Sequence, residues 1–291
     1  MTRTVLTAAL SLLLLGACAS QPPAASQADE ATPAMQAATH AANTAALDEA
    51  IAGSWRTPAF TARDAHRHPK ETLTFFGVRP DQTVIEITPG GGWYTEVLAP
   101  YLRGNGRYVA AVWDDAIVGQ PKYRYGLNKT LREKIAGNAA QYDATDVRVF
   151  DPKAPVFGAA ASADVVLTFR NAHNWVDEGT EKAYFKAFFD VLKPGGTLGV
   201  VDHRAKPGTA LEKMKSSGYL TEALVIELAQ GAGFVLDARS EVNANPRDTT
   251  DHPNGVWTLP PSKQHEKADD AKYQAIGESD RMTLRFIKPR G

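Results

Sequence analysis

The sequence predicts one α/β domain whose mostly parallel β-sheet is covered by helices on both faces. Three observations support this fold class. From about residue 84 onward, short apolar runs alternate with segments of helical spacing; a glycine-rich turn follows the first run; and polar clusters follow the later ones. Strands separated by helices of this length join through right-handed crossovers, which make the strands parallel. Ligands of such sheets bind beyond the carboxyl ends of the strands.

The glycine-rich turn lies in residues 84–95, which read Val-Ile-Glu-Ile-Thr-Pro-Gly-Gly-Gly-Trp-Tyr-Thr. A β-branched run with one acid, Glu86, breaks into a proline and three glycines before helical spacing resumes. Glycines let the backbone approach a ligand where a Cβ would collide, and the next helix points unpaired N–H groups at the turn. We therefore expect a nucleotide-type ligand site here.

The later elements follow in chain order. Strands are expected at residues 107–113, 147–150, 163–169 and 197–201, and helices at 127–140 and about 184–192, where the last helix stops at Lys193-Pro194-Gly195-Gly196.

The chain before the turn predicts two helical pieces. Leu47, Ile51 and Trp55 fall at helical spacing, and a second piece covers residues 69–76.

A polar segment, residues 63–69, separates these two pieces. It contains His66 and His68, but Arg67 lies between them and no other clear ligand is near, which disfavours a metal site against a solvated or salt-bridged helix entry. A third interpretation is a lid over the glycine turn.

The tail predicts a helix at residues 220–230, a strand at 234–242, a long polar loop at 243–275 and a last strand at 282–287. Two closing strands joined by a long excursion suit a terminal hairpin in which the last strand is antiparallel.

The amino terminus predicts export. Arg3 precedes an apolar run at residues 5–15, too short to span a bilayer, and the run ends near Cys18, the only cysteine. This pattern resembles a bacterial lipoprotein signal peptide at residues 1–17, which implies a lipid anchor at Cys18. Ala19 then favours the outer membrane, facing the periplasm. The alternative is an ordinary cleaved secretory signal.

Composition bounds the rest. Residues 18–44 are mostly Ala, Gln, Ser, Pro and Thr, which predicts a disordered tether before one domain at 45–291. The formal net charge of −1, with both signs interspersed, argues against nucleic acid as a partner.

From about residue 69 to 289 the chain resembles a class I, Rossmann-like S-adenosylmethionine-dependent methyltransferase, most closely the group that carries secretion signals. The resemblance is carried by residues 86–95, by Asp114, by Phe-Arg-Asn-Ala-His-Asn-Trp at 169–175 and by Leu-Lys-Pro-Gly-Gly at 192–196. The glycine turn and the Lys-Pro-Gly-Gly stop are moderately specific alone; their order and spacing make the combination strong. The resemblance implies a doubly wound, seven-stranded sheet, mostly parallel with an antiparallel last strand.

The resemblance also implies S-adenosylmethionine as the cofactor. Gly90 and Gly92 would let the turn pass close to its methionine part, and Glu86 would contact its amino group directly or through water. A charged residue inside an apolar strand needs such a partner.

Acids at later strand ends would hold the nucleoside. Asp114 or Asp115 suits two ribose hydroxyls, and Asp151 lies where this fold commonly holds the adenine amino group. The alternative for each is an ordinary strand-end or turn aspartate. The expected cofactor set is Glu86, Pro89, Gly90, Gly91, Gly92, Tyr94, Thr95, Asp114, Asp151 and Arg170.

The candidate chemistry lies in residues 170–175. Asn171 and His173 alternate, so an extended conformation would turn them to the same side. We expect His173 to act as base or to orient the acceptor, with Asn171 positioning. The alternative is that both satisfy backbone groups in a tight loop, and His203, after Asp202, is the second candidate. No ligand spacing supports a metal.

Two functions follow. The first is a methyltransferase acting on a small-molecule or envelope-component acceptor. The second is a non-catalytic lipoprotein that binds a ligand or serves as a scaffold, because the cofactor is made in the cytoplasm. A turn plugged by Trp93, Tyr94 or residues 63–69 would favour the second. A nicotinamide dehydrogenase is disfavoured because Thr95 stands where its fingerprint has a glycine.

Overall fold

The computed structural model describes residues 1–2 and 32–291. Cys18 lies outside the described residues, and so does the expected signal peptide apart from its first two residues. The chain divides into two units, Met1–Thr39 and His40–Gly291. The second unit contains the sheet.

The structure differs from the expected tether at residues 18–44, because α1 (Pro33–Ala52) begins within it. Alanine has the highest intrinsic helix propensity, and a proline is well tolerated at the first helical position. The Met35 N–H donates to Thr32 Oγ1 at 3.3 Å, as a helix start requires. The absence of large apolar side chains therefore does not keep this stretch from being helical.

The sheet has seven strands in the order β3-β2-β1-β4-β5-β7-β6. Only β7 runs antiparallel to its neighbours β5 and β6, and the other pairs are parallel. The predicted sheet is confirmed. The strands are β1 (Thr83–Ile87), β2 (Arg107–Trp113), β3 (Asp146–Phe150), β4 (Ala163–Phe169), β5 (Leu192–His203), β6 (Val235–Ser240) and β7 (Arg281–Ile287).

Helices precede, connect and follow the strands. Besides α1 they are α2 (Pro58–Thr61), α3 (Asp64–Arg67), α4 (Pro69–Phe75), α5 (Thr95–Leu102), α6 (Lys122–Gly137), α7 (Ala139–Tyr142), α8 (Ala172–Glu178), α9 (Glu181–Val191), α10 (Leu211–Ser217), α11 (Glu222–Gly231) and α12 (Asp270–Ile276), with 3₁₀ turns η1 (Gly255–Thr258) and η2 (Lys267–Asp269). Within the described residues, no helix combines the length and the apolar character needed to cross a membrane.

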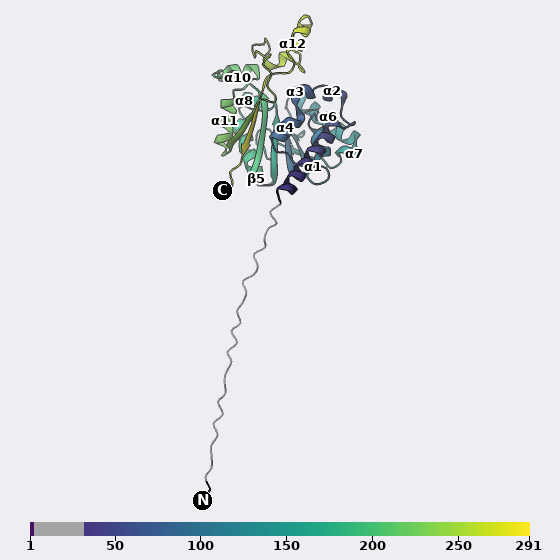
Figure 1. The fold of residues 1–291 in the computed structure, drawn as a ribbon. Helices are drawn as coiled ribbons and strands as arrows, with labels where there is room; N and C mark the ends of the chain where they lie inside the picture. The colour runs from purple at the N-terminus through teal and green to yellow at the C-terminus, as the bar shows by residue number, and fades with distance from the viewer. Residues whose placement is uncertain (3–31) are drawn as a thin grey trace. The chain divides into compact units, whose positions relative to one another are not determined.

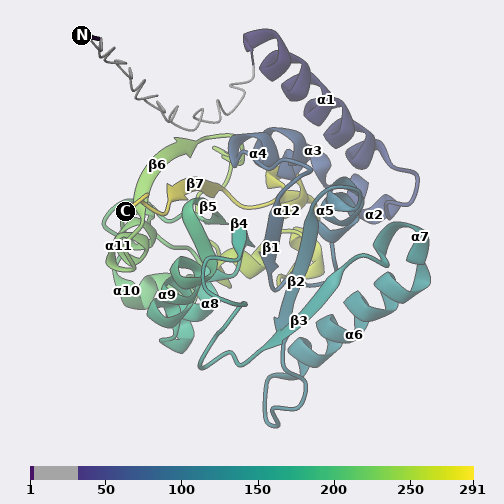
Figure 2. The same ribbon diagram turned by 90° about the horizontal axis from the view of Figure 1, so that it is seen from below.

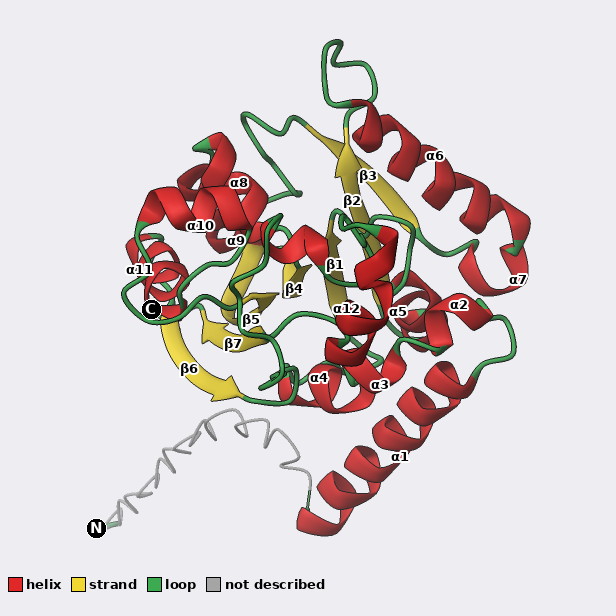
Figure 3. Ribbon diagram, turned by 90° about the horizontal axis from the view of Figure 1, so that it is seen from above, coloured by secondary structure: helices red, strands yellow, loops and turns green. Residues whose placement is uncertain are grey.

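The helices cover both faces of the sheet, as predicted. Figures 2 and 3 show α8 to α11 on one side and α5 to α7 on the other. Side chains of β1 alternate between the two cores: Ile85 and Ile87 belong to the core that includes side chains of α9 and α11, whereas Val84 belongs to the core that includes side chains of α4 and α5. Glu86 shares the face of Val84, so its carboxylate points into an apolar layer.

Two expectations differ in detail. Trp55 lies beyond the end of α1, in a turn, where its Nε1–H donates to the backbone oxygen of Glu96 at 2.9 Å. The expected loop at 243–275 contains η1, η2 and α12. Figure 1 draws α12 and α3 at the same end of the sheet. The loop thus covers the carboxyl edge of the parallel strands, where a ligand is expected.

Candidate active site

A cavity of about 740 Å³ opens at the carboxyl ends of β1 and β4. Four segments form most of its wall: the turn after β1, residues 60–67, residues 169–175 and residues 256–264. The volume is typical of pockets for small molecules and cofactors. The ligand site predicted for this edge therefore has a counterpart in the structure.

The glycines of the turn have different surroundings. Gly90 and Gly91 line the cavity and Gly92 does not. Gly90 has a φ of +61°, and a Cβ placed on it would meet nothing within 4 Å, so its backbone faces open space. Gly92 has a φ of +85°, and a Cβ placed on it would lie 3.0 Å from Cδ of Lys134. Gly92 thus meets the positive φ of the turn in a tightly packed place, whereas Gly90 leaves room for a ligand.

Glu86 lines the cavity although it is only 2% exposed. The Tyr108 hydroxyl donates to Glu86 Oε2 at 2.5 Å and lies 2.8 Å from Oγ1 of Thr95. Burial raises the pKa of Glu86 to about 8, although the Tyr108 hydrogen bond and the charge of Arg67 oppose this. The carboxyl group is therefore mostly protonated at neutral pH until a cation approaches. Thr95 lies behind this pair, outside the cavity lining.

Other residues of the turn also face the cavity. Pro89 and Tyr94 line it, and the Tyr94 ring stacks on Phe169 with 3.7 Å between centroids. Nε1–H of Trp93 donates to the backbone oxygen of Phe60 at 2.9 Å, which fastens residues 60–67 over the turn. The hydroxyl oxygen of Thr88 is buried without a hydrogen-bond partner among the described residues. Open space at Gly90 and an unsatisfied oxygen at Thr88 both fit a bound polar ligand.

The aspartates expected to hold the nucleoside lie outside the cavity lining. Asp114 Oδ1 accepts from the Ala116 N–H at 2.9 Å, and exposed Asp151 accepts from the Lys153 N–H at 2.8 Å. Both accept a hydrogen bond within their own turns, and their roles in holding the nucleoside stay predictions. Aromatic rings, those of Trp113 and Tyr123, line the cavity at this end instead.

His173 faces the cavity from a helix. The predicted extended conformation of residues 170–175 is wrong: Arg170 adopts φ +63° and α8 begins at Ala172. The helix brings His173 Nδ1 to 2.8 Å from Oδ1 of Asp202, at the end of β5. His173, in the first turn of α8, therefore points back over the carboxyl edge of the sheet.

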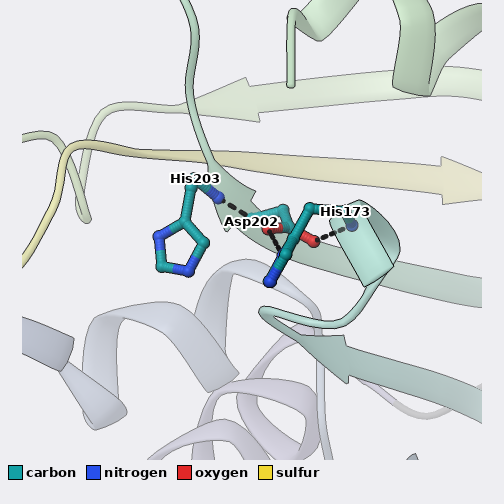
Figure 4. A group of neighbouring side chains, drawn as sticks. All are labelled: His173, Asp202 and His203. Carbon is teal, nitrogen blue, oxygen red and sulfur yellow. Dashed lines mark hydrogen bonds and ion pairs between the residues drawn. The ribbon is translucent and has the colours of Figure 1, made fainter. Parts of the chain in front are cut away.

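Asp202 holds both histidines in place (Figure 4). Its Oδ1 also accepts from the His203 N–H at 2.8 Å, and its Oδ2 accepts from the His173 N–H at 3.3 Å. His203 Nδ1 lies 2.5 Å from Oγ of Ser279, and the two imidazole rings are 5.0 Å apart. Because each Nδ1 is engaged, Nε2 of each ring is the nitrogen available to a ligand.

The second histidine is held neutral. Burial, then His173 and nearby arginines, with Arg170 first among them, keep the pKa of His203 well below its ordinary value. His203 thus adds a neutral imidazole beside the His173–Asp202 pair.

Asn171 lines the cavity but also serves the fold. Its Nδ2 donates to the backbone oxygen of Ile87 at 3.0 Å and to Oγ1 of Thr168 at 3.2 Å. These bonds tie the end of β4 to the end of β1, which is the structural role named as the alternative. Its role in positioning an acceptor stays a prediction.

A metal ion is worth weighing at the histidines. In the described part of the chain, His173, Asp202 and His203 form the one group of three potential ligands, with ligand atoms within 4.8 Å of one another. Sequence spacing could not reveal it, because the residues come from two elements. However, Asp202 already accepts three N–H bonds, and the arginines that act on His203 would repel a divalent cation. The geometry fits a hydrogen-bonded His–Asp pair better.

Several residues of the site were missed by sequence reasoning. Asp202 entered only as the neighbour of His203, although an acid that ends an apolar strand is the same signal that identified Glu86. Trp257 belongs to the expected polar loop, and its ring lies 6.2 Å from His173. Arg63 and Arg67 line the cavity, which supports the lid interpretation of residues 63–69. His66 and His68 belong to no metal-type group among the described residues.

Comparison with solved structures identifies the fold, whereas comparison of the sequence finds no match. No family model and no curated protein matches the sequence. A SAM-dependent methyltransferase from Aquifex aeolicus matches the structure with a TM-score of 0.52 and 14% identity, over 84% of this chain and 98% of that one. One from Methanosarcina mazei matches with a TM-score of 0.50 and 12% identity, over 75% and 97%. The fold is that of S-adenosylmethionine-dependent methyltransferases.

The methyltransferase fold explains where the cavity lies and which strands frame it. At these identities the likeness is one of fold, and the finer resemblance to a group with secretion signals stays a prediction. A scaffold without a ligand site is not favoured, because Arg63, Arg67, Trp93 and Tyr94 line the cavity without filling it.

Proposed function

We propose that the protein is an exported S-adenosylmethionine-dependent methyltransferase that acts on a small-molecule or envelope-component acceptor. The single observation that supports this most is that one cavity joins the glycine turn and Glu86 to the His173–Asp202 pair. The signal-like amino terminus supports export, and a lipid anchor at Cys18 would hold the domain at the outer membrane, facing the periplasm.

The turn side of the cavity suits the cofactor. S-adenosylmethionine supplies a methyl group on a positively charged sulfur. Glu86, once ionised, would accept a hydrogen bond from the cofactor amino group, while Gly90 and Gly91 would admit its methionine part. Thr88 Oγ1 is one further unsatisfied group that the cofactor could engage.

The histidine side suits the acceptor. Asp202 accepts the Nδ1–H of His173, so Nε2 carries the lone pair that faces the cavity. His173 Nε2 would take the proton that the acceptor atom loses as it gains the methyl group. Asp202 would then stabilise the imidazolium, and His203, being neutral, would add little repulsion. Positioning supplies the rest of the acceleration.

Calorimetric titration of the purified protein with S-adenosylmethionine and with S-adenosylhomocysteine tests the proposal. We expect one site per chain for each compound. A folded protein that binds neither would refute the proposed function.

A further inference from the structure

Four arginines surround one buried carboxylate, Glu278, at the edge of the cavity. Arg63 Nε donates to Glu278 Oε1 at 2.6 Å, while Arg67 Nε and Arg281 Nη1 lie 3.4 and 3.2 Å from Oε2. The charge of Glu278 also acts on Arg170, whose pKa burial lowers to about 10. Burial alone would raise the pKa of Glu278, but these arginines, Arg67 foremost, hold it well below its usual range. The group has an excess of positive charge, which is costly in a buried place.

The unsatisfied donors of this group belong to residues that line the cavity. Arg63, Arg67 and Arg170 line it, and Arg281 does not. Nη2 of Arg63, Nε and Nη2 of Arg67 and Nε of Arg170 are buried without a hydrogen-bond partner among the described residues. Arg281, by contrast, donates to the backbone oxygens of Ser279 and His66. Buried N–H groups without partners need an explanation, and a ligand in the cavity is the nearest one.

Arg67 is the most constrained of the three. It is 4% exposed, and its guanidinium carbon lies 4.8 Å from the centroid of the Trp93 ring. Burial first, then the charge of Arg170, lowers its pKa well below the ordinary value. A planar fork of N–H donors held in this way matches the oxygens of a carboxylate or phosphate.

The nearby acids do not fully neutralise the excess. Glu86 is mostly protonated at neutral pH, so four guanidinium groups are opposed by two carboxylates, Glu278 and Asp202, the second of which acts on Arg170. The charge is therefore left for a ligand to balance.

The arginines lie beside the proposed base. Arg170 follows β4, and Glu278 precedes β7, which runs antiparallel to β5, so the group lies at the carboxyl ends of β4 and β5 and at the amino end of β7. Arg170, Arg281 and Arg67 all act on the charge of His203, which ends β5. An anion bound here would lie next to the histidines.

We propose that Arg63, Arg67 and Arg170 bind a carboxylate or phosphate group of the molecule on which His173 acts. The acceptor is then a small anion-bearing compound, held by its anion while the atom to be methylated faces His173. The identity of that molecule as a methyl acceptor rests on the proposed function.

The test titrates the full-length protein with inorganic phosphate and, separately, with acetate, at an ionic strength kept constant with sodium chloride. Melting temperature is recorded with and without saturating S-adenosylhomocysteine. We expect the better anion to raise the melting temperature by a few degrees in both conditions. The stronger of the two responses indicates whether the acceptor carries a phosphate or a carboxylate.

Arg67→Gln should lose most of this rise, whereas Arg103→Gln, an exposed arginine paired with Asp143, should keep it. Because Arg67→Gln removes one of four clustered like charges, we expect it to fold and, without anion, to melt no lower than the wild type. Arg63→Gln repeats the test in case Arg67→Gln does not fold.

Equal responses in the Arg67 and Arg103 variants would overturn the proposal. So would an anion response that S-adenosylhomocysteine abolishes, because the arginines would then hold the carboxylate of the cofactor itself. Failure of S-adenosylhomocysteine to bind refutes the proposed function separately, and the Arg67→Gln response still decides whether the anion site exists.

Discussion

The two sides of the cavity differ in charge and in how they are assembled. The turn side offers a buried carboxyl, Glu86, that is held mostly neutral and linked to Tyr108 and Thr95. The opposite side offers two histidines and an excess of guanidinium groups around Glu278. The first is ready to receive a cation and the second an anion. Because of this contrast, one cavity can bind a positively charged methyl donor at the turn side and a negatively charged acceptor at the histidine side, and each ligand is disfavoured at the other side.

The largest expected effect breaks the histidine side. His173→Gln removes the proton acceptor, so the methylation rate should fall by about 10²- to 10⁴-fold while affinity for S-adenosylhomocysteine stays the same. Release of S-adenosylhomocysteine in the presence of an acceptor found among anionic compounds measures the rate. His252→Gln is the matched control, since His252 forms a buried pair with Asp248, at 2.8 Å, outside the cavity lining. An equal loss in both variants would contradict the assignment.

The next effect probes Glu86 through stability. Its pKa is raised in the folded state, to about 8 from 4.5, so the folded protein holds a proton that the unfolded chain releases. The contribution of Glu86 to the free energy of unfolding is therefore fully present below pH 4.5. It is lost as the pH rises through 8, by on the order of a few kcal/mol. Urea unfolding of the wild type and of Glu86→Gln between pH 5 and 8.5 measures the difference. The pH dependence of the two proteins should diverge in this window, and parallel curves would show that Glu86 is not the titrating group.

A smaller effect concerns the open space at the turn. Gly90→Ala and Gly179→Ala both place a side chain at positive φ with nothing within 4 Å, so both should lose about 1 kcal/mol of stability. Gly179 ends α8 and is outside the cavity lining, so only Gly90→Ala should weaken binding of S-adenosylhomocysteine, by about tenfold or more. Calorimetry on the two variants decides whether the space at Gly90 belongs to the ligand.

The smallest effect is on the arginine side. Arg67→Gln relieves repulsion among four buried cations but loses a 3.4 Å ion pair with Glu278, so its stability should equal or exceed that of the wild type by up to about 1 kcal/mol. Urea unfolding at pH 7 measures it. A large loss of stability would mean that Arg67 stabilises the fold. Such a loss would weaken the inference that the arginine side is built to receive an anion.

Features whose residues lie close together in the sequence could be predicted, and features that join distant residues could not. The glycine turn is contiguous, so its strand, its turn and its helix could all be read, and the strands at 107–113 and 163–169 have the predicted bounds. The His173–Asp202 pair joins residues 29 positions apart and the Arg63–Glu278 pair joins residues 215 apart, which no local pattern encodes. The helical start at Ala172 was missed because the positive φ of Arg170 turns the chain without a glycine.

The most direct test of the central claim is calorimetric titration with S-adenosylhomocysteine at pH 7 in buffers of different ionisation enthalpy. We predict binding at one site per chain with release of about one proton, because the ligand's ammonium group ionises Glu86, and we expect this release to disappear in Glu86→Gln. Absence of binding by the folded protein, or binding with the same proton release in Glu86→Gln, would contradict this prediction.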